Sequence, residues 1–312
     1  MQKAVISVHD LKTDFYKRYT HDGGMADTVF CPYSAVLFGG TGDPGVLPAL
    51  CLRLSFGASA AFRRRNDDRL VFSLTDSDIR AEINKINIEK LRSPKWAKDM
   101  AASIARLPLK LGGIEMLIRS DVSEPELAPK KLCAVQAAAN AFCAGFSPAV
   151  ILRAAGESAH YLPSLLDKNQ RAAIVNTATL DYLPINFSLP AQKIIIIRVL
   201  SKRSAPQFTN AYRERELERL NSAAEILKNG SADALAPIMR AASRDMLSVH
   251  KKTSAKLLFS LCTDFTDAVR IMPDYRGAAV FMPDAKIDEF TRLVSDRYEK
   301  KAGVRPAFYI SD

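Results

Sequence analysis

The sequence predicts an α+β protein with two subdomains, and three observations support this. The 312 residues are 48% hydrophobic and 25% charged, a composition that allows a large core and two domains. Strand-like and helix-like segments are interleaved, without a repeat of 30 to 40 residues. The chain ends in a strand–helix–strand pattern over Val269–Ile310, which suits half of a ferredoxin-like unit. We expect domains at 1–187 and 188–312.

The N-terminal elements follow from hydrophobic spacing. A helix is expected at Asp10–Thr20, where Leu11, Phe15 and Tyr19 recur every four residues. A second helix is expected at Ser93–Leu107, because Pro94 suits a first turn and the apolar residues after it share one face. The other expected features are strands at Thr28–Tyr33, Arg69–Leu74 and Ile114–Arg119, and a charged hairpin turn at Arg63–Asp68.

The C-terminal elements are predicted in the same way. Four consecutive isoleucines in Lys193–Leu200 indicate a buried strand. Ser147 and Pro148 open a helix, and Gly303 is the expected residue just after another. The remaining expectations are helices at Leu132–Cys143, Ala211–Lys228 and Ala285–Lys301, a further helix that opens at Ser231, and strands at Ala278–Met282 and Ala307–Ile310.

Composition excludes several classes of protein. The longest apolar run, around Ile194–Ile197, is far too short to span a membrane, so we expect a cytoplasmic protein that does not bind a membrane. The five cysteines are odd in number and form no C-x-x-C pair, which indicates free thiols in a reducing compartment. The four histidines are not paired at metal-binding spacing, so no metal site is expected.

The formal charge of +10 raises the question of a nucleic-acid or acidic partner. The basic residues lie in short, scattered clusters near turns and element ends, which favours a solvated surface. No nucleic-acid-binding module and no set of stacking aromatics accompanies the charge, so nucleic acid is not favoured as a partner.

The stretch FCPYSAVLFGGTGDPGVLPAL, from Phe30 to Leu50, is the most distinctive part of the chain. It places four glycines within seven residues, between two apolar segments. Such a loop is able to cradle a phosphate, and its glycines are also able simply to let the chain bend.

In order along the chain, several segments resemble the galactokinases of the GHMP kinase family. The opening stretch is similar to the pattern P-G-R-x-N-L-I-G-E-H-x-D-x-x-x-G-x-V-L-P. Further similarities are Leu111-Gly112-Gly113 with Asp121-Val122, Thr209 to Arg215, and the ending Lys301 to Tyr309. The resemblance implies a two-subdomain fold, with an N-terminal part like ribosomal protein S5 domain 2 and a ferredoxin-like C-terminal part. It also implies ATP and Mg²⁺ as cofactors, if the protein is active.

The elements that handle phosphate in the family are altered here. Where the family has G-x-G-L-S-S-S-A, this chain has Ser123 to Lys131, with no glycine, two prolines and two carboxylates. Lys130 and Lys131 remain as candidate nucleotide contacts, acting as point charges. Of the family's third motif, G-A-G-F-G-G, only Gly277 remains. Ser34 stands where the family has an arginine.

The sugar end of the family's site is partly kept. The resemblance makes Asp167 the candidate catalytic base, and it makes Asp43 and Tyr212 candidate sugar contacts. The glutamate and histidine of the family motif are replaced by Gly40 and Thr41. Each candidate also has an ordinary structural explanation: a turn acid for Asp43, an exposed carboxylate for Asp167 and a core aromatic for Tyr212.

Four functions therefore stay open. The first is a galactokinase-like pseudokinase with weak or no phosphoryl transfer, which binds a sugar, another small ligand or a partner. The second is an active, divergent sugar kinase in carbohydrate metabolism, using Asp167 as base and Lys130, Lys131 or Arg276 to hold phosphates. The third is a structural or regulatory module with a protein partner. The least favoured is a basic nucleic-acid binder, whose retention would be sensitive to salt.

Overall fold

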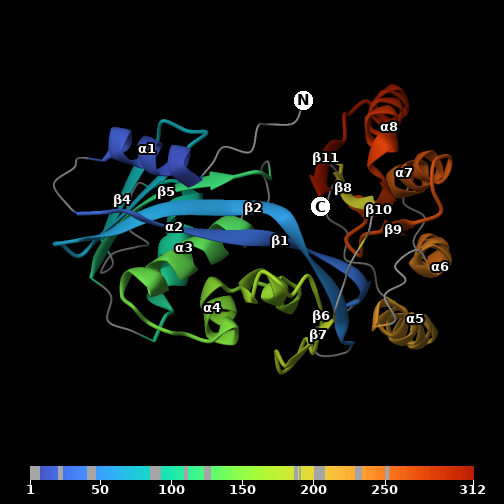
Figure 1. Cartoon of the computed structure of the whole chain (residues 1–312), viewed down its shortest axis with the longest axis horizontal. Helices are drawn as coiled ribbons and strands as arrows, with labels where there is room; N and C mark the ends of the chain where they lie inside the picture. Colours follow the sequence, from blue (N-terminus) through green and yellow to red (C-terminus); the bar gives the residue numbers. More distant parts are fainter. Residues whose placement is uncertain are drawn as a thin grey trace. The chain divides into compact units, whose positions relative to one another are not determined.

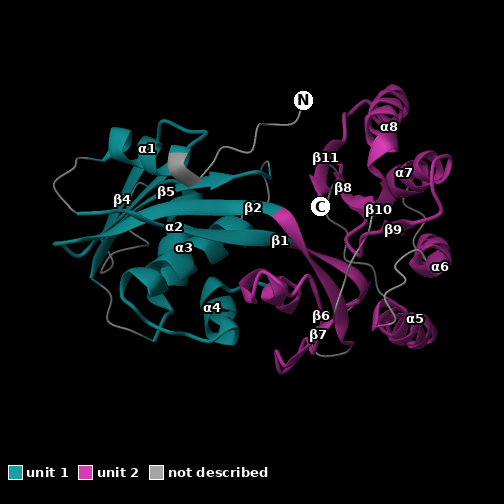
Figure 2. Ribbon diagram, viewed as in Figure 1, with its two compact units in different colours: residues 1–33, 56–158 teal, residues 34–55, 159–312 magenta. Residues whose placement is uncertain are grey.

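The chain folds into two compact units (Figure 2). Unit 1 comprises Met1–Tyr33 and Phe56–Ser158, and unit 2 comprises Ser34–Ser55 and Ala159–Asp312. The predicted boundary between residues 187 and 188 stays a prediction. The computed structural model describes residues 8–19, 24–40, 47–84, 93–108, 112–122, 128–185, 189, 191–199, 208–228, 234–249 and 253–312.

Unit 1 is built on a mixed β-sheet (Figure 1). Strand β3 (Arg69–Leu74) lies between β4 (Arg80–Asn84), to which it is antiparallel, and β5 (Gly113–Ser120), to which it is parallel. On its other edge, β5 pairs antiparallel with the second half of the long strand β2 (Ala49–Arg65). Strand β1 (Asp27–Gly39) also pairs with β2.

Helices cover both faces of this sheet. Helix α1 (Val8–Arg18) lies on one face (Figure 1). The other face carries α2 (Lys95–Ala105), α3 (Ala128–Ala141) and α4 (Pro148–Ala155). The alternation of side chains along the strands therefore gives two apolar faces, which agrees with the largely buried pattern of β2, β3 and β5.

A buried ion pair lies on the α1 face of the sheet. Arg63 on β2 and Glu115 on β5 are direct cross-strand neighbours, and their side chains are ion-paired and only 5% exposed. The guanidinium of Arg63 also lies 5.4 Å from the centre of the Phe15 ring of α1. The charge beneath α1 is therefore paired and covered.

Unit 2 contains the first half of β2, which pairs with β6 (Ala172–Val175), and β6 pairs in turn with β7 (Tyr182–Ile185). A short 3-10 helix, η3 (Ala159–Leu165), precedes β6.

A second, four-stranded antiparallel sheet completes unit 2, in the order β11-β8-β10-β9. Its strands are β8 (Gln192–Arg198), β9 (Val269–Ile271), β10 (Gly277–Pro283) and β11 (Ala307–Ser311). Helices connect β8 to β9 and β10 to β11, which is the ferredoxin-like arrangement. These helices are α5 (Asn210–Lys228), α6 (Leu235–Val249), α7 (Thr253–Thr263) and α8 (Ile287–Ala302), the last preceded by the 3-10 turn η5 (Asp284–Lys286).

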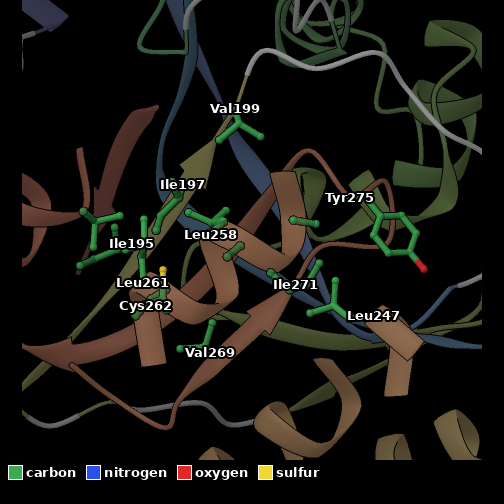
Figure 3. Close-up of a cluster of buried hydrophobic side chains, with 14 of the residues drawn as sticks. Ile195, Ile197, Val199, Leu247, Leu258, Leu261, Cys262, Val269, Ile271 and Tyr275 are labelled. Carbon is green, nitrogen blue, oxygen red and sulfur yellow. The ribbon is translucent and has the colours of Figure 1, made fainter. Parts of the chain in front are cut away.

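The core of this sheet lies between β8, β9 and β10 and the helices (Figure 3). Ile195 and Ile197 point into it, together with Leu258 and Cys262 of α7 and Val269 of β9. Ile194 and Ile196, which alternate with them, are also at most 2% exposed. The run of four isoleucines is thus buried on both faces, as its composition indicates.

The α+β class is confirmed, and most expected elements recur with small shifts at their ends, whereas the strand expected to end at Tyr33 continues to Gly39 in β1. Gly303, at a φ of +72°, ends α8 as expected. The hairpin expected around Arg63–Asp68 is wrong, because β5 lies between β2 and β3 in the sheet. Helix α7 is not among the elements expected from the sequence. Within the described ranges, every helix is too short or too polar to cross a bilayer.

Candidate functional site

The candidate site of unit 2 begins on helix α5. Thr209 caps this helix, since its Oγ1 accepts the backbone N–H of Tyr212 at 3.2 Å. Tyr212, Glu216 and Leu220 follow at intervals of four residues, so they share one face of the helix, and all three are at most 1% exposed. A carboxylate is therefore held on the buried face, where it requires partners.

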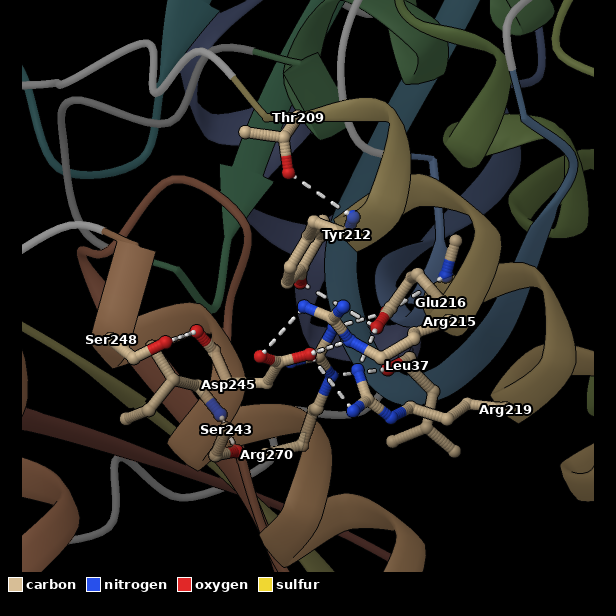
Figure 4. A network of polar contacts seen from close by, with 12 residues as sticks. Leu37, Thr209, Tyr212, Arg215, Glu216, Arg219, Ser243, Asp245, Ser248 and Arg270 are labelled. Carbon is tan, nitrogen blue, oxygen red and sulfur yellow. Dashed lines mark hydrogen bonds and ion pairs between the residues drawn. The ribbon is translucent and has the colours of Figure 1, made fainter.

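The partners of Glu216 lie on its own helix and on two other segments of unit 2, β1 and β9 (Figure 4). Its Oε1 accepts the backbone N–H of Gly39 at 3.2 Å and is ion-paired with Nη2 of Arg270. Its Oε2 lies 3.4 Å from Nη1 of Arg219 and 3.5 Å from the Tyr212 hydroxyl. Glu216 is thus the shared acceptor that joins α5, β9 and the end of β1.

Arg270 is the central residue of β9 and is fully buried. Its Nε donates to the carbonyl oxygen of Leu37 at 2.8 Å, and its guanidinium lies 5.6 Å from the centre of the Phe38 ring. Burial alone would lower the pKa of Arg270, but the adjacent Glu216 carboxylate and Tyr212 hydroxyl together outweigh that effect and raise it. The guanidinium is therefore charged.

The network continues outward through Asp245 of α6. This carboxylate accepts two hydrogen bonds from Arg215, at 2.8 and 3.0 Å, and one from Arg219 at 2.9 Å. These bonds, chiefly those from Arg215, hold the pKa of Asp245 below its usual value. Arg219 bridges the two carboxylates and so links the buried pair to the surface of α5 and α6.

The glycine-rich segment, residues 39–48, begins beside this network at Gly39, and its two ends are joined by a backbone hydrogen bond. The N–H of Gly40 donates to the carbonyl oxygen of Pro48 at 3.0 Å, and Thr177 Oγ1 donates to the carbonyl oxygen of Leu47 at 2.9 Å. Gly39 has a φ of +71°, and a Cβ there would overlap the carbonyl oxygen of Pro48. This glycine is therefore needed for the bend itself. Asp43 and Thr41 lie outside the described residues.

Tyr212 is placed within this network. Its ring stacks on Phe208, with centroids 4.5 Å apart, and its hydroxyl points at Glu216. Burial raises its pKa, so the hydroxyl remains protonated at neutral pH. Its predicted role as a sugar contact stays a prediction.

Ser34, which stands where the resemblance implies an arginine, is 1% exposed. Its hydroxyl donates to the backbone carbonyl of His160 in η3. This residue therefore ties β1 to η3 and presents no cation.

Asp167 lies in the exposed turn that follows η3. Its Oδ1 accepts the backbone N–H of Asn169 at 2.9 Å, and its carbonyl oxygen accepts the N–H of Gln170 at 2.9 Å. These contacts make it a turn-forming aspartate with a carboxylate open to solvent. Its predicted role as a base stays a prediction.

The third motif lies at the turn between β9 and β10. Tyr275 occupies this turn at a φ of +55°, a conformation that favours glycine, and it is fully buried. Asp274 accepts hydrogen bonds from Arg198 at 3.2 Å and from Nε of Arg276 at 3.0 Å. A Cβ at Gly277 would overlap the carbonyl oxygen of Ile197 on β8. Gly277 thus serves close strand pairing, and the turn presents side chains rather than a glycine-rich backbone.

The two lysines at the start of α3 in unit 1 have different surroundings. Lys130 is buried, at 1% exposure. Lys131 forms an ion pair with Glu157, and both side chains are less than 20% exposed. Residues 123–127 of the second motif lie outside the described residues, and the nucleotide roles of Lys130, Lys131 and Gly277 stay predictions.

At the third motif, a buried tyrosine and a paired aspartate occupy the turn where the resemblance implies glycines. The described part of the chain does not gather three or more His, Cys, Asp or Glu side chains at a potential metal site.

Glu216 and Arg270 were not among the candidate residues from the sequence, although a pattern for one exists. A glutamate on the apolar face of a helix, four residues from Tyr212 and Leu220, indicates a buried and paired carboxylate. Arg270 sits between Val269 and Ile271 in a short strand, where alternation alone does not say which face is buried.

Solved structures resemble this chain over nearly its whole length. The galactokinase of Lactococcus lactis, complexed with galactose, superposes with a TM-score of 0.81 at 14% identity, covering 98% of each chain. A homoserine kinase from Cytophaga hutchinsonii gives 0.66 at 11% identity, covering 94% of this chain and 96% of that one. The mevalonate kinase of Methanococcus jannaschii gives 0.60 at 12% identity, covering 92% and 98%.

No model of a known protein family and no curated protein sequence matches the chain. The structural neighbours are GHMP kinases, and the ferredoxin-like sheet and mixed N-terminal sheet described above agree with them. The chain has the GHMP kinase fold.

Proposed function

We propose that this protein is a galactokinase-like pseudokinase, which binds a sugar or a related small ligand with weak or no ATP-dependent phosphorylation. The turn between β9 and β10 is the observation that carries the proposal. In the galactokinases that this sequence resembles, glycines at this turn let the backbone close over a nucleotide. Here the buried Tyr275 fills it, and Asp274 already accepts hydrogen bonds from Arg198 and Arg276, the cations that a phosphate at this turn would need.

Two further observations support the proposal. The Lys131 ammonium is already paired with Glu157, so holding a phosphate would cost that ion pair. Ser34 makes a backbone hydrogen bond in the position where the family has a cation. Three changes around one expected ligand support a loss of phosphoryl transfer more strongly than one substitution would.

The test has two steps, with the Lactococcus lactis galactokinase as a positive control. Titration calorimetry with Mg·ATP is expected to give no measurable heat of binding below millimolar concentration. A coupled assay of ADP release over a panel of sugars, including galactose, is expected to stay at background. Micromolar ATP affinity together with sugar-dependent ADP release would contradict the proposal.

The second candidate is an active, divergent sugar kinase that transfers the ATP γ-phosphate to galactose or a related molecule. The accessible carboxylate of Asp167 favours it, because a general base must reach a substrate hydroxyl. If turnover is found, Asp167→Asn should reduce it by at least about 100-fold. Asp181→Asn, at another exposed turn carboxylate, is the matched control and should leave turnover unchanged.

A third candidate is a regulatory module that acts through a protein partner in the cytoplasm. The motive is that the chain resembles the galactokinases in layout, while the motifs that bind phosphate in that family are altered. Light scattering for self-association and co-purification from the native cell distinguish it from the two ligand-based candidates.

A further inference from the structure

Two buried side chains of opposite charge form hydrogen bonds with the backbone where the glycine-rich segment leaves β1. Arg270 binds the carbonyl oxygen of Leu37, and Glu216 binds the N–H of Gly39, two residues further on. Arg270 and Glu216 are paired with each other, and both are 0% exposed. A single ion pair thus holds the strand end at two backbone groups, one on each side of Phe38 (Figure 4).

Stability alone does not account for a pair of this kind. Removing two charges from water is costly, and apolar residues of similar volume often stabilise a core as well or better. The ion pair adds directional hydrogen bonds, because a carboxylate accepts and a guanidinium donates only in certain geometries. Here these hydrogen bonds are made with the backbone of Leu37 and Gly39, and the N–H of Gly40 then donates to the carbonyl oxygen of Pro48.

We propose that Glu216 is a positioning residue, which with Arg270 fixes the backbone of residues 37–40 and so the direction in which the glycine-rich segment leaves β1. Its consequence for ligand binding rests on the proposed function, in which the protein binds a sugar, together with the prediction that Asp43 of the same segment contacts that sugar. Glu216 itself is fully buried, so it acts on a ligand through the Gly39 backbone.

The first test follows the Gly39 amide by NMR, in protein labelled with [15N]glycine. In the wild type this amide is expected to exchange slowly with solvent, because it is buried and bonded to a carboxylate. In Glu216→Gln it should exchange at least about tenfold faster, since a hydrogen bond to a charged acceptor is the stronger kind. The matched control is Glu115→Gln, which breaks the buried Arg63–Glu115 pair of unit 1 and should leave Gly39 unchanged.

A Gly39 amide that exchanges equally in the wild type and in folded Glu216→Gln overturns the proposal, and so does an equal acceleration by Glu115→Gln. If Glu216→Gln does not fold, Arg270→Lys replaces it, because lysine keeps the charge but not the fork that reaches both Leu37 and Glu216. The wild type alone is also decisive: rapid exchange of Gly39 in the intact protein overturns the proposal without any variant.

The second test uses galactose as the probe, in titration calorimetry. We expect Glu216→Gln to bind galactose at least tenfold more weakly than the wild type, and Glu115→Gln to bind it with the same affinity as the wild type. Equal affinities in all three proteins overturn the link to ligand binding. If the wild type binds neither galactose nor any other sugar of the panel, the proposed function fails, while Gly39 exchange still decides the positioning role.

Discussion

The hydroxyl of Tyr275 donates a hydrogen bond to the carbonyl oxygen of Met246 at 3.0 Å. Met246 lies in the last turn of α6, whose final carbonyl groups have no partners within the helix. Tyr275 therefore closes the end of α6 from a turn where its own backbone is strained, at a φ of +55°. The burial of its ring and this bond together offset the strain.

Tyr275→Phe should lower the free energy of unfolding by about 1 kcal/mol, because it leaves the Met246 carbonyl buried without its partner. Urea unfolding followed by circular dichroism measures this. Tyr182→Phe, at an exposed tyrosine, is the control and should change stability by less than about 0.5 kcal/mol. Equal values for the two variants would show that the bond to Met246 contributes nothing.

Glu216→Gln should lower the free energy of unfolding by roughly 3 to 5 kcal/mol, because it leaves the Arg270 charge buried without its counter-ion. The double variant Glu216→Leu with Arg270→Met should be more stable than Glu216→Gln, since it removes both charges. Urea unfolding of Glu216→Leu, Arg270→Met and the double variant completes a double-mutant cycle, which measures the coupling free energy between the two side chains. A double variant whose losses simply add would argue against a coupled pair.

Acid should destabilise the protein through Asp274 and Asp245. Burial alone would raise the pKa of Asp274, but the nearby Arg198 and Arg276 outweigh it, and the pKa lies below its usual value. Arg215 and Arg219 lower that of Asp245. A folded-state pKa below the unfolded value of about 3.9 gives stability that is complete above that pH and lost as the pH falls through the folded value.

The measurement is the free energy of unfolding between pH 7 and pH 2.5. Asp274→Asn should be less stable than the wild type at pH 7 by roughly 2 kcal/mol, the value of a charge-assisted bond, and the two should converge as the pH falls below about 4. A constant difference over the whole range would rule out this linkage.

Gly277→Ala should destabilise the protein by about 2 kcal/mol or more, because its Cβ would overlap the Ile197 carbonyl oxygen of the paired strand. Gly145→Ala is the control, since a Cβ there meets nothing within 4 Å. Thermal unfolding without any nucleotide distinguishes the two. A stable Gly277→Ala protein would return this glycine to the candidates for nucleotide contact.

Local pattern was enough to predict much of the fold. The isoleucines of β8 are buried whichever elements cover them, and the apolar spacing in Asp10–Thr20 gives α1 directly. The pairing of β2 with β5 was not predictable in this way. The turn after Arg65 has the composition of a hairpin, and only the parallel pairing of β3 with β5 separates β2 from β3.

The candidate site shows the same division. The family motif drew attention to Tyr212 and to the glycines, all of which are local features. The Glu216–Arg270 pair joins residues 54 positions apart, and it depends on α5 and β9 meeting the end of β1. A pattern along the chain says that Glu216 needs a partner, but not that Arg270 is that partner.

Strands β1 and β2 are each divided between the two units, and this constrains how the protein is made. Unit 2 draws residues 34–55 from near the start of the chain and the rest from residue 159 onward. A fragment of the C-terminal half alone would lack Leu37 and Gly39, the backbone partners of Arg270 and Glu216. On the ribosome, those two strands emerge long before the residues that complete their unit. The first half of β2 therefore waits for β6, and the end of β1 waits until Glu216 and Arg270, in the last third of the chain, have been synthesised.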